Sequence, residues 1–302
     1  PLPYVNSLPL SIEEVELDPP QSGEVLVQIK AAGLCHSDLV AINGERAKPV
    51  PMVIGHEASG IVSKVGPDVY GLAVGDHVVP VYVANCGRCD MCQEGRPALC
   101  QPATIANKAG TLIDGTTRLH SDGQIIFHHS GVAAFSEYAV ISQNALVRID
   151  PEIPFEVAAL FGCAVVTGVG SVVNTANVKP GQSVAIVGLG GVGLNALLAA
   201  VMSGAGQVVA VDAKEKKLKI ASQFGAHDTF NTNMENCMDE ILAVTDGGVH
   251  FAFETAGVSP ALDLAYKITR RGGTTIVAGM PGPEASIMLS HLSLSAEERT
   301  IK

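Results

Sequence analysis

The chain has 302 residues, enough for two domains of ordinary size, and 47% of them are hydrophobic, which gives each domain material for a core. Its formal net charge is −11 at pH 7, with no clustered excess of lysine and arginine. A nucleic-acid backbone requires such an excess, so the composition excludes nucleic-acid binding. The seven cysteines are an odd number and no signal peptide precedes them, so we expect a reducing cytoplasm.

The chain is predicted to contain a β-rich half followed by an α/β half. Short β-type runs punctuated by glycine and proline occur at 25–31, 59–65, 76–82 and 139–147, which favours a partly closed sheet. Helical patterns follow at 155–160 and 167–176. Strands at 183–187, 207–212, 249–254 and 274–278 then alternate with helices at 193–203, 214–224 and 261–269. Such alternation predicts a doubly wound parallel sheet. We place the boundary near residue 164, giving domains 1–164 and 165–302.

An apolar stretch at 184–202 is long enough for a membrane span and contains a single polar side chain, Asn195. Its first third is β-branched, and four glycines between positions 188 and 193 would interrupt a continuous helix. We therefore predict a strand, a glycine turn and a helix here, and no contact with a membrane.

Four cysteines within fifteen residues form the densest motif: Cys86, Cys89, Cys92 and Cys100. Four thiolates suit zinc in a closed tetrahedral site, where the metal holds a loop together. Two alternatives stay open. An iron–sulfur cluster is one, although the bacterial pattern places its fourth cysteine closer; two disulfides are the other, and they need an oxidising compartment.

A glycine motif lies between a predicted strand and a predicted helix. Gly188, Gly190 and Gly193 match G-x-G-x-x-G, in which the glycines permit a tight turn, the approach of a pyrophosphate and close packing of helix on strand. Asp212 ends the next strand, where its carboxylate would accept from ribose hydroxyls and repel a 2′-phosphate, which favours NAD over NADP. In the alternative interpretation the glycines only make a turn and Asp212 caps a helix.

Three further candidate ligands, Cys35, His56 and Cys163, are far apart in sequence. Taken singly, each is more often a buried thiol or a hydrogen-bonded histidine than a ligand. Together, two thiolates and one imidazole leave one position open on a zinc ion, the pattern of a catalytic site.

With these motifs the sequence resembles the zinc-containing alcohol dehydrogenases of the medium-chain dehydrogenase/reductase family. The matching segments are Cys35-His36-Ser37-Asp38, Gly55-His56-Glu57, the four cysteines, Gly162-Cys163, Thr167-Gly168, the glycine motif, Asp212, Phe253-Glu254 and Gly279-Met280-Pro281. The resemblance implies a GroES-like catalytic domain, a Rossmann cofactor domain and two zinc ions per chain. It places catalytic zinc on Cys35, His56 and Cys163, and structural zinc on the four cysteines.

The resemblance also implies the reaction: a small alcohol and its aldehyde or ketone are interconverted by hydride transfer between a zinc-bound alkoxide and NAD. Ser37 would take the alcohol proton, Asp38 would orient His56, and Glu57 would lie behind the metal. Tyr82 and Met280 would line the substrate pocket. The implied cofactor contacts are His36, Thr167, Gly188, Gly190, Gly191, Val192, Gly193, Asp212, Lys217 and Gly279.

Some features depart from the family pattern or stay open. Val40 stands where some members have a histidine, so the later steps of the proton relay are unassigned. Both ends look cut, with a clipped N-terminal strand and no C-terminal return segment. A homodimer or homotetramer is expected. The histidine pair His128-His129 could reach the substrate cleft but is expected to be solvated rather than catalytic, and Cys237 is expected to be a small buried hydrophobe. The alternatives are a zinc-stabilised NAD-binding protein without turnover and a zinc-free quinone-type reductase.

Overall fold

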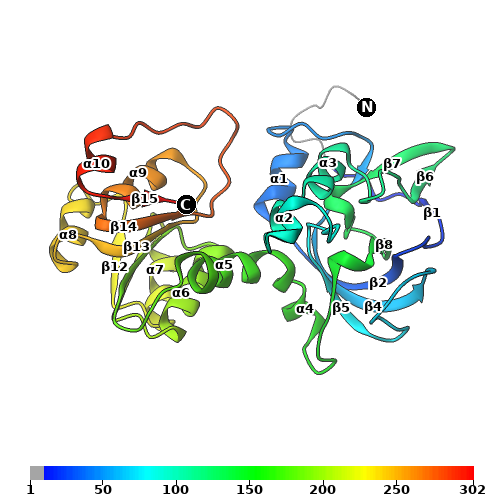
Figure 1. The fold of residues 1–302 in the computed structure, drawn as a ribbon, viewed down its shortest axis with the longest axis horizontal. Coiled ribbons are helices and arrows are strands. Elements are labelled where there is room, and N and C mark those ends of the chain that lie inside the picture. The colour runs from blue at the N-terminus through cyan, green and yellow to red at the C-terminus, as the bar shows by residue number, and fades with distance from the viewer. Residues whose placement is uncertain (1–9) are drawn as a thin grey trace. The chain divides into compact units, whose positions relative to one another are not determined.

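A computed structural model describes residues 10–302 of the chain. The chain divides into two compact units, of which the first ends at Cys163 and the second runs from Ala164 to Lys302 (Figure 1). The prediction of a clipped N-terminal strand concerns residues outside the described range.

The first unit is built on two sheets of mostly short strands. One has the order β8-β2-β4-β5-β9 and the other the order β1-β6-β7-β3, and neither order closes into a barrel within residues 10–163. Alternate residues of the long central strands, such as Val25 and Val27, are fully buried, as a sheet with one face on the core requires. The strands are β1 (Glu16–Leu17), β2 (Glu24–Gly33), β3 (Met52–Val53), β4 (Glu57–Val65), β5 (His77–Pro80), β6 (Leu119–Ser121), β7 (Gln124–His128), β8 (Tyr138–Ser142) and β9 (Leu146–Arg148).

The helices of this unit are short and connect the strands. They are α1 (His36–Ile42), α2 (Asp90–Gln93), α3 (Gln101–Ala109), α4 (Phe155–Ala158) and the 3-10 turns η1 (Pro97–Leu99), η2 (His129–Gly131) and η3 (Gln143–Ala145). The single strand predicted at 139–147 is wrong, because η3 separates β8 from β9. Gln143 explains the break: its side chain accepts from the backbone N–H of Tyr70 and donates to the carbonyl of Asp68, which holds the chain in a turn.

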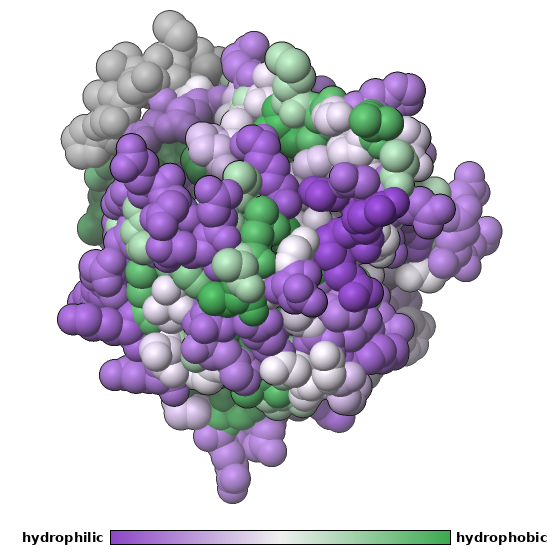
Figure 2. Space-filling model, turned by 90° about the vertical axis from the view of Figure 1, so that its left-hand side faces the viewer, coloured by the Kyte–Doolittle hydropathy of each residue, from purple (hydrophilic) through white to green (hydrophobic). Residues whose placement is uncertain are grey.

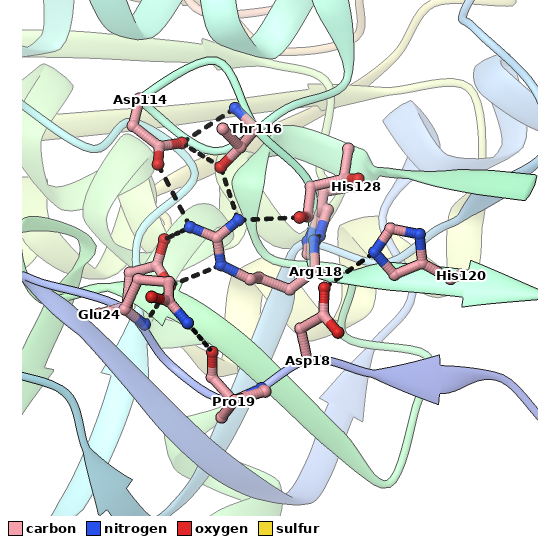
Figure 3. A network of polar contacts seen from close by, with 10 residues as sticks. Asp18, Pro19, Glu24, Asp114, Thr116, Arg118, His120 and His128 are labelled. Atoms are coloured by element: carbon pink, nitrogen blue, oxygen red, sulfur yellow. Dashed lines mark hydrogen bonds and ion pairs between the residues drawn. The ribbon is translucent and has the colours of Figure 1, made fainter. Parts of the chain in front are cut away.

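A buried ion pair links the two sheets (Figure 3). The guanidinium of Arg118, just before β6, donates to both carboxylate oxygens of Glu24 in β2, at 2.9 and 2.7 Å. It also donates to Thr116 Oγ1 at 2.7 Å and lies 3.3 Å from the carboxylate of Asp114. The backbone N–H of Arg118 donates to Nε2 of His128 at 3.1 Å. The bidentate pair therefore fixes the start of β6 against the start of β2.

The second unit is a six-stranded parallel sheet with helices on both faces, as predicted. Its order is β12-β11-β10-β13-β14-β15, so the direction of winding reverses between β10 and β13. The strands are β10 (Ser183–Val187), β11 (Gln207–Asp212), β12 (Asp228–Asn231), β13 (Val249–Glu254), β14 (Thr269–Val277) and β15 (Thr300–Ile301). The helices are α6 (Gly191–Met202), α7 (Glu215–Gln223), α8 (Cys237–Val244), α9 (Ser259–Lys267) and α10 (His291–Ala296).

Both faces of this sheet are covered. Val184 and Ile186 pack with residues of α6 and α7, whereas the alternate Ala185 and Val187 pack with residues of α8 and α9. A strand buried on both sides is a continuous apolar run, which is why its limits were readable from sequence. The face that Figure 2 shows is mainly hydrophilic, with smaller apolar areas between the polar groups.

One helical segment of the described residues, Phe155–Ala176, is long and apolar enough to cross a membrane by length and composition alone. It consists of α4, the π-helical η4 (Phe161–Val165), α5 (Val166–Gly170) and the π-helical η5 (Ser171–Ala176). Part of this segment packs against the protein, because Ala158 and Val172 are fully buried and a Cβ on Gly162 would collide with the carbonyl of Pro80, whereas Val157 and Val166 are about half exposed. The stretch at 184–202 divides into β10, a glycine turn and α6, as predicted.

Candidate functional site

Three distant segments meet in the first unit. Side-chain ligand atoms of Cys35, His56, Glu57 and Cys163 all lie within 4.8 Å of one another. The ladder between β2 and β4 pairs Gly33 with Glu57, which brings the residues after β2 beside those before β4. Cys163 enters from η4. The structure thus brings together the three dispersed residues that the sequence indicated, with Glu57 beside them.

Asp38 holds two of these residues in place. It is fully buried; one carboxylate oxygen lies 2.9 Å from Nδ1 of His56, and the other accepts the backbone N–H of Cys35 at 2.9 Å. With Nδ1 engaged, the imidazole keeps Nε2 for another partner, which is the arrangement that orients metal-bound histidines. Burial alone would lower the pKa of His56, but the hydrogen bond that Nδ1 donates to Asp38 and the neighbouring Cys35 raise that pKa to about 9.

The two sulfur atoms compete for one negative charge. The hydrogen bond from Cys163, opposed by burial and assisted by His56, lowers the pKa of Cys35 to about 4. The same hydrogen bond, followed by burial and by the charge on Cys35, raises the pKa of Cys163. Burial and Cys35 likewise raise the pKa of Glu57. A divalent cation is the group that would let both thiols ionise at once in such a place, so the donor set fits a soft metal ion such as zinc.

The expectation that His128 and His129 are solvated is wrong, because both are buried, with exposed fractions of 0% and 3%. His129 Nδ1 lies 3.1 Å from the same oxygen of Asp38 that contacts His56, and the two rings meet edge to face at 5.3 Å between centroids. Sequence reasoning missed this second imidazole at Asp38. The sequence of β7 gives no local signal for this burial, because the apolar Ile125 is exposed while Ile126 and the terminal His128 are buried.

Four further residues lie near this cluster in sequence or in space: Tyr82, Ser37, His36 and Val40. The Tyr82 ring lies edge-on to His56, with centroids 6.1 Å apart, and burial followed by the charges of Cys163 and Cys35 raises the pKa of its hydroxyl. Ser37 is half-buried in the first turn of α1, which begins immediately after Cys35, whereas His36 is exposed. Val40 is buried on the same helix.

The four cysteines of the dense motif also converge, with their sulfur atoms all within 4.8 Å of one another. Backbone amides point at the sulfurs: the N–H of Cys86 donates to Cys100 and that of Cys89 donates to Cys86, both at 3.3 Å. The N–H of Arg88 lowers the pKa of Cys86 to about 6. All seven cysteines of the chain lie in the described part and are free thiols, so the two-disulfide alternative is not formed. Four thiols preset by amide donors fit a tetrahedral zinc ion.

The glycine motif of the second unit connects β10 to α6. Gly188 has φ +98°, a left-handed conformation, and a Cβ on it would collide with Ala256. Asp212, at the end of β11, accepts the backbone N–H of Leu189 inside the motif at 2.8 Å. It also accepts the N–H of Lys214 at 2.9 Å and lies 3.2 Å from Nζ of Lys217. Asp212 therefore holds the glycine turn and also binds the residue that precedes α7.

The remaining residues indicated by sequence lie around this turn or on the loop after β14. Gly168, which follows Thr167, packs so closely on α6 that a Cβ there would collide with the carbonyl of Val192. Gly279 packs against the N–H of Gly257, and Met280 is 59% exposed. Cys237 is buried in the core under α8, as expected.

Comparison with known proteins places two matches on the chain. The family model described as an alcohol dehydrogenase GroES-like domain matches residues 21–151, and the model described as a zinc-binding dehydrogenase matches residues 191–302. These matches confirm the expected GroES-like and Rossmann-type domains.

Similar proteins are found both by sequence and by structure. S-(hydroxymethyl)glutathione dehydrogenase of Escherichia coli O1:K1 is 39% identical over 278 residues, which cover 91% of this chain and 75% of that protein. The Synechocystis protein of the same name is 40% identical with the same coverage. Benzyl alcohol dehydrogenase of Acinetobacter calcoaceticus has a TM-score of 0.90 at 34% identity, over 95% of this chain and 78% of that one. An alcohol dehydrogenase zinc-binding domain protein of Burkholderia ambifaria has a TM-score of 0.94 at 35% identity, over 99% of this chain and 81% of that one.

Proposed function

Because the chain belongs to the zinc-containing alcohol dehydrogenases of the medium-chain dehydrogenase/reductase family, we propose that it interconverts a small alcohol and its aldehyde or ketone with NAD as the hydride carrier. The observation that carries the proposal is the convergence of Cys35, His56 and Cys163 on one buried point. Two thiolates and an imidazole leave a zinc ion one open position, as catalysis on an alcohol requires.

The proposal assigns two zinc ions to each chain. Catalytic zinc would be held by Cys35, His56 and Cys163, and structural zinc by Cys86, Cys89, Cys92 and Cys100. When bound, the catalytic ion acts as a Lewis acid that increases the acidity of the alcohol hydroxyl.

The residues around the site would take up the alcohol proton and hold the zinc ligands in position. Ser37 follows Cys35 in the chain and is half-buried, so its hydroxyl can receive the alcohol proton in a place that excludes most water. Asp38 holds the His56 ring through Nδ1 and the Cys35 backbone through its N–H, which fixes both side chains before substrate arrives. Glu57 lies behind them, buried and with a raised pKa.

The cofactor is proposed to be NAD, bound at the carboxyl end of the second unit's sheet. The helix that begins at Gly191 would direct its N–H groups at the pyrophosphate. Asp212 would accept from the adenosine ribose, and its negative charge would disfavour the 2′-phosphate of NADP. The further cofactor contacts proposed are His36, Thr167, Gly188, Gly190, Val192, Gly193, Lys217 and Gly279.

The substrate is proposed to be a small, uncharged alcohol or aldehyde in a pocket lined by Tyr82 and Met280. The related proteins are named for S-(hydroxymethyl)glutathione and for benzyl alcohol, so both belong in any substrate test. The protein is further proposed to act as a homodimer or homotetramer in the cytoplasm.

The test combines metal analysis with turnover. Zinc would be measured per chain in the purified protein, and NAD reduction would be followed over primary, secondary and aromatic alcohols and over formaldehyde mixed with glutathione, with NADP as the control cofactor. We expect two zinc ions and NAD-dependent turnover of at least one alcohol. Two zinc ions with no turnover of any substrate would instead favour a zinc-stabilised binding protein.

A further inference from the structure

Glu254 is a buried carboxylate at the carboxyl end of β13, the strand next to β10. Its side chain is 1% exposed. One oxygen accepts two backbone N–H groups, from Ala256 at 2.8 Å and from Gly257 at 2.6 Å. Hydrogen bonds to an ionised group are about twice as strong as those between neutral groups. The carboxylate therefore fixes the turn formed by residues 255–257.

That turn contacts the glycine motif on one side. The N–H of Thr255 donates to the carbonyl of Val187 at 2.9 Å, and its hydroxyl donates to the carbonyl of Gly188. The Cβ and the backbone nitrogen of Ala256 lie 2.8 Å from the position that a Cβ on Gly188 would take, so they leave no room for a side chain there. The conformation of the motif and the position of the turn therefore depend on each other.

On its other side the turn meets the loop after β14. Gly257 has φ +73°, and a Cβ on it would approach the backbone of Met280 to 3.1 Å. The N–H groups of Ala278 and Gly279 both donate to the carbonyl of Glu254, at 2.9 and 3.0 Å. The backbone and the side chain of one residue thus hold both loops at this end of β13 and β14.

The strand order indicates which half of a dinucleotide these loops would face. Asp212 ends β11 and Glu254 ends β13, on opposite sides of β10. A dinucleotide crosses the carboxyl ends of the strands at the point where the winding reverses, here between β10 and β13. With the adenosine half on the side of Asp212, the nicotinamide half would lie over β13 and β14.

We propose that Glu254 is a positioning residue for the nicotinamide half of the cofactor, acting through the turn 255–257 that its carboxylate holds. The inference rests on the NAD site of the proposed function. An uncharged glutamine has one side-chain oxygen that can accept the same two N–H groups, whereas alanine leaves both unpaired in a buried place.

Binding of NADH and of AMP separates this role from a general effect on the unit. NADH affinity would be measured from the fluorescence change of the reduced nicotinamide, and AMP affinity by calorimetry, since AMP has only the adenosine half. We expect Glu254→Ala to raise the Kd of NADH about tenfold or more, the effect of losing hydrogen bonds to a buried charge, and to leave that of AMP within about twofold. Glu254→Gln should restore NADH binding to within about threefold of the wild type.

Two other variants complete the test. Ile241→Ala destabilises the same unit from the core under α8, away from the turn, and should leave both affinities unchanged. Gly257→Ala strains the turn without altering the carboxylate and should selectively weaken NADH binding, which keeps the test decisive if Glu254→Ala does not fold.

Unchanged NADH binding in Glu254→Ala would overturn the inference. If Glu254→Ala does not fold, unchanged NADH binding in Gly257→Ala would overturn it instead. Equal weakening of NADH and AMP would overturn it too, because Glu254 would then support the whole unit. A wild-type protein that binds neither NADH nor AMP would refute the proposed cofactor, and the inference with it.

Discussion

Burial of His128 predicts that the protein loses stability in mild acid. The ring is 0% exposed and its Nε2 accepts the backbone N–H of Arg118, so the folded protein holds it neutral. Burial, with a contribution from the charge of Arg118, lowers its pKa to about 4 from an ordinary 6.5. The stabilisation is therefore complete above pH 6.5, where the unfolded chain is also neutral, and is lost as the pH falls toward 4. The loss relative to pH 7.5 is about 2 kcal/mol at pH 5 and about 3 kcal/mol below pH 4.

Urea unfolding at pH 7.5 and pH 5.0, followed by far-ultraviolet circular dichroism, measures this loss. The matched control is His128→Gln, whose side-chain oxygen can still accept the N–H of Arg118 but does not titrate. The other titrating groups are common to both proteins and cancel in the difference. Between the two pH values the wild type should lose about 2 kcal/mol more than the variant.

Equal losses in the two proteins would refute the reasoning, because His128 would then not be the group that acid charges. If the glutamine variant does not fold, the ring protons of wild-type His128 give the same answer by nuclear magnetic resonance. A ring that titrates near pH 6.5 in the folded protein would contradict a neutral, buried histidine beside the network in Figure 3.

Three further predictions concern the proposed site. Ser37→Ala should lower kcat by about 10²–10⁴-fold in steady-state assays while both zinc ions stay bound, and an unchanged kcat would remove Ser37 from the proton path. Cys89→Ser should leave one zinc ion per chain by metal analysis and lower the melting temperature, and retention of two ions would contradict the four-cysteine site. Asp212→Ala should raise the ratio of kcat/KM for NADP to that for NAD, and a ratio that stays constant would show that another group selects the cofactor.

The elements of the second unit were predictable because the sequence pattern of each element lies within that element. The expected strands at 183–187, 207–212 and 249–254 coincide with β10, β11 and β13. β10 and β11 are buried on both faces and are nearly continuous apolar runs that end at Gly188 and at Asp212, whereas β13 includes the partly buried His250. The glycine motif was readable for the same reason, since its turn needs glycine at fixed positions whatever the rest of the chain does.

The first unit was predicted less well because several of its elements depend on distant partners. No strand was expected where β6 and β7 occur; these strands are short, and Arg118, which precedes β6, is fixed by Glu24, 94 residues earlier in the chain. Three residues of a strand carry too little pattern to be recognised without that partner.

The same difference between local patterns and distant partners explains which residues of the candidate site could be predicted. Cys35, His56 and Cys163 carry no local signal of their meeting, because the ladder between β2 and β4 brings only the first two together and Cys163 enters from η4. Their residue types suggested a zinc site, and the resemblance to a family assigned it. His129 had no such help and was expected in water, although it lies 3.1 Å from Asp38. A polar residue can be buried when a partner elsewhere in the chain compensates for its desolvation. Its burial therefore cannot be predicted from the sequence around that residue alone. Glu254 differs because its partners, Ala256 and Gly257, are its own neighbours. The turn after β13 is therefore held by contacts within the sequence Glu254-Thr255-Ala256-Gly257, so it needs no distant partner to form.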